Sequence, residues 1–220
     1  MGRVVFAKLR ATDRLVLTGT VSVFVFIALS LIAARYGVFD LDRKTDAVVG
    51  LTRHASLQRP METISLLGQG TALLPLIALG SVVTWRHRRR WALALPLVMA
   101  GAGGLQLLAK WAVDRPRPNA APWGFPSGHA LIVVVFFGII AYLIWTSCTR
   151  RGWRCATSVL CAATVLAVGF SRLYLDMHWL SDIGGGFAIG LGYLLLTIRV
   201  VELVPAHVPF PSRKGYTTRG

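Results

Sequence analysis

The sequence predicts an all-α, polytopic membrane protein, a bundle of six transmembrane helices with both termini in the cytoplasm. Three observations lead to this fold class: an apolar composition, recurrent stretches of membrane-spanning length, and an unequal distribution of basic residues between successive loops. Of the 220 residues, 55% are hydrophobic and only 15% are charged, whereas roughly a quarter are charged in an ordinary soluble domain. We expect one membrane domain, because several spans leave no room for a soluble domain.

The expected spans follow from the length of the apolar stretches. A helix needs about 20 predominantly apolar residues to cross roughly 30 Å of hydrocarbon. The first apolar stretch is longer than the roughly 7–15 residues of a signal-peptide core, so we expect a retained helix. The membrane domain is expected over residues 15–203, between a cytoplasmic tail (1–14) and a disordered cytoplasmic tail (204–220). Its six spans are expected at 15–34, 63–84, 92–113, 129–147, 155–172 and 181–203.

The basic residues indicate which side of the membrane each loop faces. Fifteen of the 24 Lys and Arg residues fall on the side that carries both termini and the loops after the second and fourth spans. The opposite side carries seven of the nine acidic residues. Short basic loops mark the cytoplasm, so both termini are expected inside. This asymmetry also accounts for most of the net charge of +15, and we therefore expect no nucleic-acid partner.

The longest outer connection, residues 35–62, carries no motif and is compatible with a short interfacial helix. Its run DLDRKTD, from Asp40 to Asp46, superficially resembles a calcium loop. The glycine and the terminal glutamate of such a loop are missing, so we expect a solvated charged turn. Within the spans, the GAGG run at 101–104 and the GxxxG pair of Gly186 and Gly190 are expected to allow close helix packing.

Ionisable residues gather near the outer ends of three expected spans. Lys110 and Arg117 lie at and just beyond the end of the third span, and Arg172 ends the fifth. Such groups are costly at membrane depth and tend to serve a function there. Three fixed cations can surround the three non-bridging oxygens of a phosphoryl group. Gly128, just before the fourth span, lets an oxygen approach the backbone N–H groups at the positive helix end.

Two histidines near the same level predict the chemistry. His178 and Asp182 are four residues apart, so on one helical face the carboxylate can accept the ring N–H. This leaves the other nitrogen free to attack phosphorus and stabilises the positive ring that results. His129 can protonate the leaving group and then deprotonate the water that hydrolyses the phosphohistidine. Each feature alone is a weak signal, but together they indicate a phosphoryl-transfer site.

These residues belong to three motifs, complete and in order: K-x6-R-P with Lys110 and Arg117, PSGH ending at His129, and S-R-x5-H-x3-D with Arg172, His178 and Asp182. The chain therefore resembles the type 2 phosphatidic acid phosphatase family, lipid phosphatases whose active site is related to that of the vanadium haloperoxidases. The resemblance covers roughly residues 100–190. Arg115 and Asp114 lie inside the first motif but outside its fixed positions. The sequence leaves open whether they make secondary contacts in the site or have no role there.

The resemblance implies a metal-independent enzyme of the cell membrane that needs no cofactor. It would hydrolyse a phosphomonoester or diphosphate of a membrane lipid on the extracytoplasmic face, with an isoprenyl diphosphate, phosphatidylglycerophosphate or phosphatidic acid as substrate. No metal site is expected, because the outer loops lack a carboxylate cluster suited to magnesium. The implied roles are His178 as nucleophile, Asp182 as its orienting partner and His129 as acid and base, with phosphate bound by Lys110, Arg117, Ser127, Gly128 and Arg172.

Two alternatives remain open at this stage. A phosphotransferase would pass the same phosphoryl group to a lipid or sugar hydroxyl instead of water, and the motifs do not distinguish it. A membrane transporter or scaffold would use the same residues to bind an anion without chemistry, although midplane charges and paired broken helices would be expected there. The sequence gives no indication of the oligomeric state.

Overall fold

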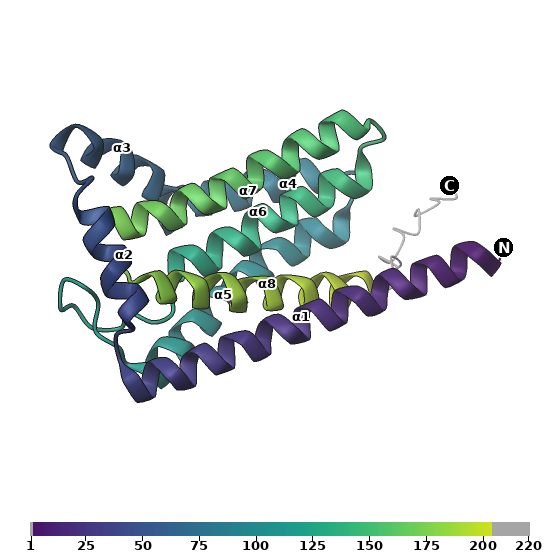
Figure 1. Ribbon diagram of the computed structural model, residues 1–220. Coiled ribbons are helices and arrows are strands. Elements are labelled where there is room, and N and C mark those ends of the chain that lie inside the picture. The colour runs from purple at the N-terminus through teal and green to yellow at the C-terminus, as the bar shows by residue number, and fades with distance from the viewer. Residues whose placement is uncertain (1, 204–220) are drawn as a thin grey trace, which may run out of the picture.

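The computed structural model describes residues 2–203, with side chains from Asp13 onward, and the expected disordered tail at 204–220 lies outside this part of the chain. The described residues form helices and no strands, which confirms the all-α prediction (Figure 1). These helices are α1 (Gly2–Tyr36), α2 (Asp40–Gly50), α3 (Ala55–Leu66), α4 (Gly70–Thr84), α5 (Arg89–Val113), α6 (Gly128–Ser147), α7 (Arg151–Tyr174) and α8 (Leu180–Leu203).

Five of the described helices are long and apolar enough to cross a bilayer, namely α1 from Asp13 onward, α5, α6, α7 and α8. The expected span at 63–84 is not one straight helix. It is divided between α3 and α4, which are bent by 42° and make a sixth span only when the two are counted together. Gly68 and Gly70 lie at the break, and a glycine in a helix interior costs about 1 kcal/mol relative to alanine.

Two other boundaries differ from the prediction. Helix α1 begins at Gly2, so residues 2–14 continue the first span as a helix. No proline interrupts this stretch, and a helix can therefore continue beyond the hydrocarbon region. Helix α7 begins at Arg151, four residues before the expected fifth span, which makes it a full-length membrane helix.

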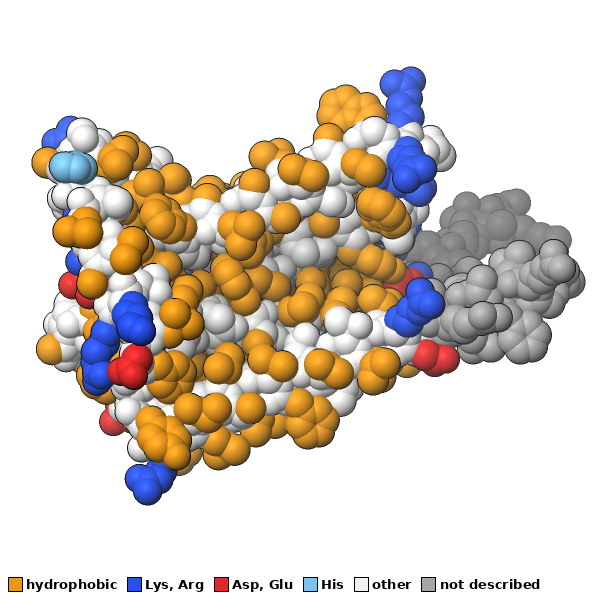
Figure 2. Space-filling view, in the orientation of Figure 1, with side chains coloured by type: hydrophobic (Ala, Val, Ile, Leu, Met, Phe, Trp, Pro, Cys, Tyr) orange, Lys and Arg blue, Asp and Glu red, His pale blue; other side chains and the backbone are white. Residues whose placement is uncertain are grey.

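Helix α8 lies at the centre of the packing. It packs along α1 and α6, while α6 also packs against α7, and α4 packs against α5. Figure 1 shows that α1 begins and α8 ends at one end of the bundle, whereas α2, α3 and the α5–α6 loop lie at the opposite end. In Figure 2 the middle of the visible face is covered by hydrophobic side chains, and charged side chains gather at the two ends, as expected for a molecule surrounded by lipid.

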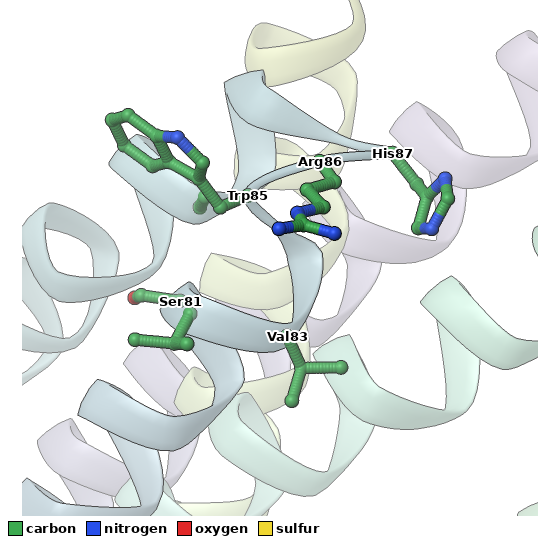
Figure 3. A pocket seen from close by; sticks show the side chains of 7 residues that line it. Ser81, Val83, Trp85, Arg86 and His87 are labelled. Carbon is green, nitrogen blue, oxygen red and sulfur yellow. The ribbon is translucent and has the colours of Figure 1, made fainter.

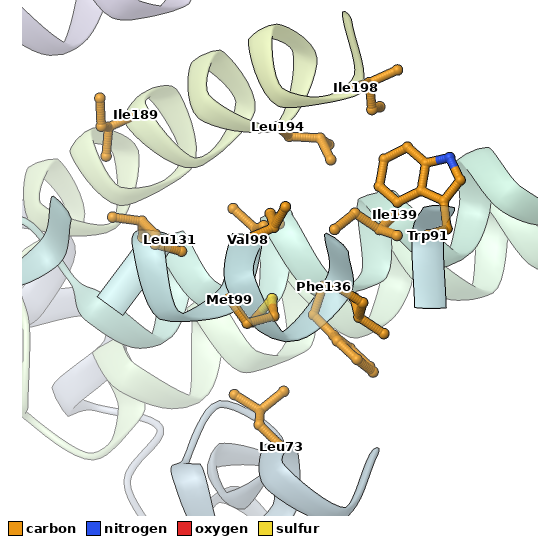
Figure 4. Packing of buried hydrophobic residues seen from close by; sticks show 13 residues of the cluster. Leu73, Trp91, Val98, Met99, Leu131, Phe136, Ile139, Ile189, Leu194 and Ile198 are labelled. Atoms are coloured by element: carbon orange, nitrogen blue, oxygen red, sulfur yellow. The ribbon is translucent and has the colours of Figure 1, made fainter. Parts of the chain in front are cut away.

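The interior between the helices is filled by large aliphatic and aromatic side chains (Figure 4). Trp91 at the start of α5 is almost fully buried and stacks obliquely against Tyr142 of α6, with ring centroids 5.5 Å apart. Lipid tails are as apolar as these residues, so dispersion contacts stabilise the interior more than exclusion of water does. The buried cluster includes Leu73, Leu95, Val98, Met99, Leu131, Val135, Phe136, Ile139, Ile189, Leu194 and Ile198.

The GxxxG pair of α8 packs directly against the backbone of α6, which confirms its expected role. A Cβ placed at Gly186 would lie 2.5 Å from the carbonyl oxygen of Ser127, and one at Gly190 would lie 2.8 Å from that of Leu131. The GAGG run contributes less, because only the first two of its four residues are in close packing, Gly101 against Tyr193 and Ala102 in the core.

The charged run at 40–46 is not the solvated turn that we expected. It forms the first two turns of α2, and Asp40 and Asp42 lie in the first turn, where the helix dipole favours acidic side chains. Asp42 accepts a hydrogen bond from the backbone N–H of Phe39 at 3.2 Å. Its side chain is only 1% exposed, whereas Asp40 remains in solvent with Arg43. Burial of Asp42 requires partners elsewhere in the chain.

We predict that Gly190→Ala destabilises the bundle while Gly184→Ala does not. The first substitution brings a methyl group against the backbone of α6, and overpacking of this kind costs about 1–3 kcal/mol. A Cβ at Gly184, on the same helix, would meet nothing within 4 Å. The midpoint of thermal unfolding in detergent checks this, and equal midpoints for the two variants would contradict the close packing of α6 and α8.

Candidate active site

All the residues expected in the site lie at the end of the bundle where α5 and α7 end and where α6 and α8 begin. Lys110 is in the last turn of α5, Gly128 and His129 begin α6, and Arg172 is in the last turn of α7. The side chains of His178 and His129 are in electrostatic range of each other and of Lys110 and Arg172. The structure therefore brings together three distant segments of the chain, as the motifs predicted.

The three cations of the site keep donors that the protein does not use. Lys110 donates to the carbonyl oxygen of Trp123, and Nη1 of Arg172 donates to Ser65 Oγ at 2.7 Å. In the described part of the chain, no carboxylate lies at ion-pair distance from Lys110, Arg117 or Arg172. Three partly buried positive charges without an acidic partner favour an external anion.

Buried polar atoms without a hydrogen-bond partner are concentrated in this site. Buried donors and acceptors are satisfied in most proteins, so each exception needs an explanation. A phosphoryl group, with its several acceptor oxygens, could satisfy the N–H and O–H donors among them. Within residues 13–203 there are seven such atoms, and all except Ser81 Oγ belong to this region: Arg115 Nε, Arg117 Nε, Ser127 Oγ, His129 Nε2, Arg172 Nε and His178 Nδ1.

His178 and Asp182 are close, but they do not share a helical face. His178 precedes α8 and Asp182 is in its first turn, with Nδ1 of His178 3.4 Å from Oδ2 of Asp182. The stronger contacts of this carboxylate are with the backbone N–H of Trp179 at 2.9 Å and with Nη1 of Arg115 at 2.8 Å. The carboxylate is therefore held from two sides while it faces the imidazole.

Burial lowers the pKa of His178 from the ordinary value of 6.5 to about 4. Loss of water contact is the largest cause, because it disfavours the charged ring. Asp182 acts in the opposite direction, while the positive charges of Lys110 and Arg172 lower the pKa further. The imidazole is consequently neutral at pH 7, which is the state that a nucleophile requires.

The PSGH turn is more constrained than the sequence suggested. The backbone N–H of Ser127 donates to the carbonyl oxygen of Asp182 at 2.9 Å. The sequence predicts backbone N–H groups at this turn that are free to bind an anion, and the N–H of Ser127 is not one of them. The bond ties the start of α6 to the start of α8. Gly128 has an additional reason to be glycine, because a Cβ there would overlap the side-chain amide of Gln106 on α5.

Sequence reasoning missed one part of the site. Arg115, whose role was open, is 2% exposed and forms ion pairs with both Asp182 and Asp42. Ser181 and Ser65 also contribute hydrogen bonds to site residues. Asp42 lies 140 positions before Asp182, in a run whose neighbours are exposed, so no local pattern distinguishes it from a surface carboxylate.

Two cavities show where space is available. One, of about 490 Å³, lies between α3 and the end of α7, where Arg59, Gln69 and Met177 line it together with Arg172. The other, of about 520 Å³, is formed by Ser81 and its neighbours at the α4–α5 turn (Figure 3). The α4–α5 turn lies at the beginning of α5, whereas Lys110 lies in the last turn of that helix. Of these two cavities, the first therefore adjoins the predicted site.

Buried cations and two histidines at one end of a helical membrane bundle define a multi-pass membrane protein with a site suited to phosphoryl groups. A family model of the PAP2 superfamily matches residues 91–204, and the chain belongs to this superfamily. This confirms the resemblance on which the predicted activity rested. The protein is accordingly a PAP2-type membrane lipid phosphatase, a hydrolase of phosphoric esters or diphosphates.

Individual relatives support this assignment. The chain is 31% identical over 182 residues to phosphatidylglycerophosphatase B of Bacillus subtilis, an alignment that covers 78% of this chain and 89% of the relative. It is 23% identical over 170 residues to an undecaprenyl-diphosphatase of Sulfolobus acidocaldarius, covering 72% and 77%. The crystal structure of a transmembrane PAP2-type phosphatidylglycerolphosphate phosphatase from Bacillus subtilis matches with a TM-score of 0.78 and 25% identity, over 86% of this chain and 98% of that one.

We predict that Gly68→Ala impairs activity while Gly70→Ala does not. A Cβ at Gly68 would lie 2.7 Å from the ring of His129, whereas one at Gly70 would meet nothing within 4 Å. Misplacement of a reacting group by about 1 Å can cost about 100-fold, so we expect the Gly68 variant to lose at least about tenfold in kcat. Phosphate release from a lipid phosphate measures this, and full activity of both variants would show that His129 tolerates displacement.

Proposed function

We propose that this protein hydrolyses a phosphomonoester or diphosphate of a membrane lipid at the extracytoplasmic face, through a phosphohistidine on His178 and without a metal ion. The observation that carries the proposal is the buried, neutral imidazole of His178, held beside Asp182 and surrounded by cations that lack an acidic partner. Such a constellation binds a phosphoryl group and presents a nucleophile to it.

The first chemical step forms a P–N bond and breaks a P–O bond. Nδ1 of His178 faces Asp182, so the other ring nitrogen, Nε2, attacks phosphorus. The leaving oxygen takes a proton from the imidazolium of His129, which acts as general acid. Asp182 stabilises the positive charge that develops on the imidazole of His178.

The second step reverses these roles. His129, now neutral, takes a proton from a water molecule that attacks the phosphohistidine. The P–N bond breaks, and inorganic phosphate leaves with neutral His178 restored. In both steps Lys110, Arg117 and Arg172 stabilise charge on the equatorial oxygens, which is the main requirement in phosphoryl transfer.

The donor set of the site supports a metal-free reaction. Magnesium prefers several carboxylate and carbonyl oxygens in a near-octahedral arrangement. Among the described residues, no group of three or more His, Cys, Asp or Glu side chains could hold a metal ion. The buried carboxylates Asp42 and Asp182 are occupied by Arg115, and the positive charge that a metal would supply is already provided by side chains.

Phosphatidylglycerophosphate is the first substrate to test. Phosphatidylglycerophosphatase B of Bacillus subtilis is 31% identical to this chain, and the match covers 89% of its length. The diphosphatase from Sulfolobus acidocaldarius is more distant, at 23%. A headgroup phosphate could enter the site from the end of the bundle while the acyl chains remain in lipid between the helices.

The proposed topology has six spans, with α3 and α4 counted as one broken span. The beginning of α1 and the end of α8 lie at the same end of the bundle, opposite the site (Figure 1). Basic residues at the end opposite the site, such as Arg86, Arg150 and Arg151, support a cytoplasmic location for that end by the positive-inside rule. The site then faces the extracytoplasmic side.

We expect purified protein in EDTA to release inorganic phosphate from phosphatidylglycerophosphate without any added acceptor. The His178→Ala variant should form no phosphoenzyme and should lose at least about 1,000-fold in kcat, since the nucleophile is absent. His129→Ala should fall by about 100-fold or more, as for other general acids. Undecaprenyl diphosphate and phosphatidic acid are assayed alongside to rank the substrates.

Each part of the proposal has an outcome that would overturn it. Loss of activity in EDTA that magnesium restores would contradict the metal-free reaction. Full activity of His178→Ala would remove the nucleophile. Phosphate released only when an alcohol acceptor is present would indicate a phosphotransferase instead of a hydrolase.

Cysteine labelling checks the face of the membrane. In a background with Cys148, Cys155 and Cys161 replaced by alanine, Asn119→Cys lies in the exposed α5–α6 loop and His87→Cys in the exposed α4–α5 turn. A membrane-impermeant maleimide added to intact cells should label the cysteine at 119 and not the one at 87. The opposite pattern would place the site in the cytoplasm.

A further inference from the structure

We infer that Asp42 of α2 is a positioning residue of the active site, which holds Asp182, and through it His178, by way of Arg115 and Ser181. The inference rests on the proposed function of His178 as nucleophile. It assigns to α2, a helix outside the three motifs and outside the matched residues 91–204, a part in the reaction.

Two ion pairs and one close approach of side chains connect α2 to the imidazole. One terminal nitrogen of Arg115, Nη2, donates to Oδ2 of Asp42, and the other, Nη1, donates to Oδ1 of Asp182 at 2.8 Å. The opposite oxygen of Asp182, Oδ2, lies 3.4 Å from Nδ1 of His178. All three ion-pairing side chains are at most 1% exposed, so solvent screens these interactions little.

Asp42 also fixes the beginning of α8. Its Oδ1 accepts the backbone N–H of Ser181 at 2.8 Å, and its Oδ2 accepts the hydroxyl of the same residue at 2.7 Å. The first N–H groups of a helix have no acceptor within the helix, so an external carboxylate stabilises them. Ser181 is adjacent to Asp182 and three residues after His178, and this cap therefore sets the position of both.

The charges explain why the second carboxylate is needed. Arg115 lies between two carboxylates, so the buried group of three carries a net negative charge beside His178. Without Asp42, the guanidinium would have Asp182 as its only ion-pair partner. The arginine would then draw the carboxylate away from the imidazole and neutralise the charge that stabilises the positive ring. Asp42 keeps Asp182 available to His178.

The groups that face His178 come from several elements. Asp182 belongs to α8, Lys110 to α5 and Arg172 to α7, and His129 of α6 is also in electrostatic range. In the part of the chain that the structure describes, Asp42 has no hydrogen bond or ion pair with the proposed phosphate-binding residues, and the cations have their own contacts, such as Arg172 with Ser65. A defect in Asp42 should therefore affect the chemical step and leave phosphate binding unchanged.

The test is a pair of isosteric substitutions on one helix, with phosphatidylglycerophosphate as substrate. Asp42→Asn should lower kcat and the rate of phosphoenzyme formation by about 10- to 100-fold, the loss typical of a small displacement of reacting groups. KM and the inhibition constant of inorganic phosphate should stay within about threefold, since the cations are untouched. Asp40→Asn, at a carboxylate 88% exposed on the same helix, should match the wild type in all of these.

A second variant protects the test against misfolding. If Asp42→Asn aggregates during size-exclusion chromatography in detergent, Ser181→Ala tests the inference in its place. This variant removes the hydroxyl that donates to Asp42 and keeps the backbone N–H that does so. It should lower kcat by about threefold or more at unchanged KM, because the lost hydroxyl both donates to Asp42 and accepts from Nη1 of Arg115. Wild-type kcat in the folded variant, or a rise in KM equal to the loss of kcat/KM, would overturn the inference.

Failure of the inference and failure of the proposed function have different signatures. An active wild type, an inactive His178→Ala and a fully active Asp42→Asn would refute only the role of Asp42. An active His178→Ala would refute the proposed function itself, whatever Asp42→Asn does.

Discussion

The guanidinium of Arg115 between Asp42 and Asp182 is the interaction on which the rest of the active site depends. It joins α2, the α5–α6 loop and α8 at a depth where solvent cannot replace a missing partner. A buried charge that loses its partner is strongly destabilising, so the three groups must fold together or not at all. The pairing also decides which charges remain for substrate. The buried carboxylates are used by Arg115, and Arg53 takes Asp46 and Asp176 nearby. Among residues 13–203, Lys110, Arg117 and Arg172 have no acidic ion-pair partner, which supports the proposed binding of a phosphoryl group.

Close helix packing transmits this arrangement into the bundle. Gly186 and Gly190 let the backbone of α8 approach that of α6, and at the end of the same interface the N–H of Ser127 binds the carbonyl oxygen of Asp182. His129 follows Ser127 by two residues, and His178 precedes Asp182 by four. The two histidines are therefore placed by one interface, although they come from different motifs. In lipid, where apolar burial gives little driving force between helices, such backbone contact is the main means of fixing two helices in register.

Much of this arrangement could be predicted from the sequence. The parts that were not predicted have one cause in common. The all-α class, the membrane helices and the family follow from features that are local in the sequence: apolar length, glycine spacing and three contiguous motifs. At the break between α3 and α4, Gly68 lies so close to His129 that a Cβ would be 2.7 Å from its ring, and the two residues are some 60 positions apart. In the sequence, Asp42 cannot be distinguished from a surface carboxylate, because its neighbours are exposed. Its partners Arg115 and Ser181 follow it by 73 and 139 residues. Periodicity and motif spacing carry no information on pairs of this kind. The i,i+4 argument for His178 and Asp182 brought the right residues together for a wrong reason, since only Asp182 lies in the helix.

Burial has two effects on the chemistry, and both favour reaction. An imidazole in water titrates near pH 6.5, so an exposed one would be protonated in part of the molecules near neutral pH. Removal from water lowers the pKa of His178 to about 4 and keeps the ring neutral. The same low dielectric strengthens the attraction between the cations and an incoming phosphoryl group. In the proposed mechanism, Asp182 matters most after attack, when the ring becomes positive and the carboxylate is the opposite charge facing it. A site of this design needs a carboxylate that is fully buried but whose negative charge is not neutralised by the cation that holds it. An arginine shared with a second carboxylate satisfies both conditions, and this links the conformation of α2 to the reactivity of a histidine that it does not touch.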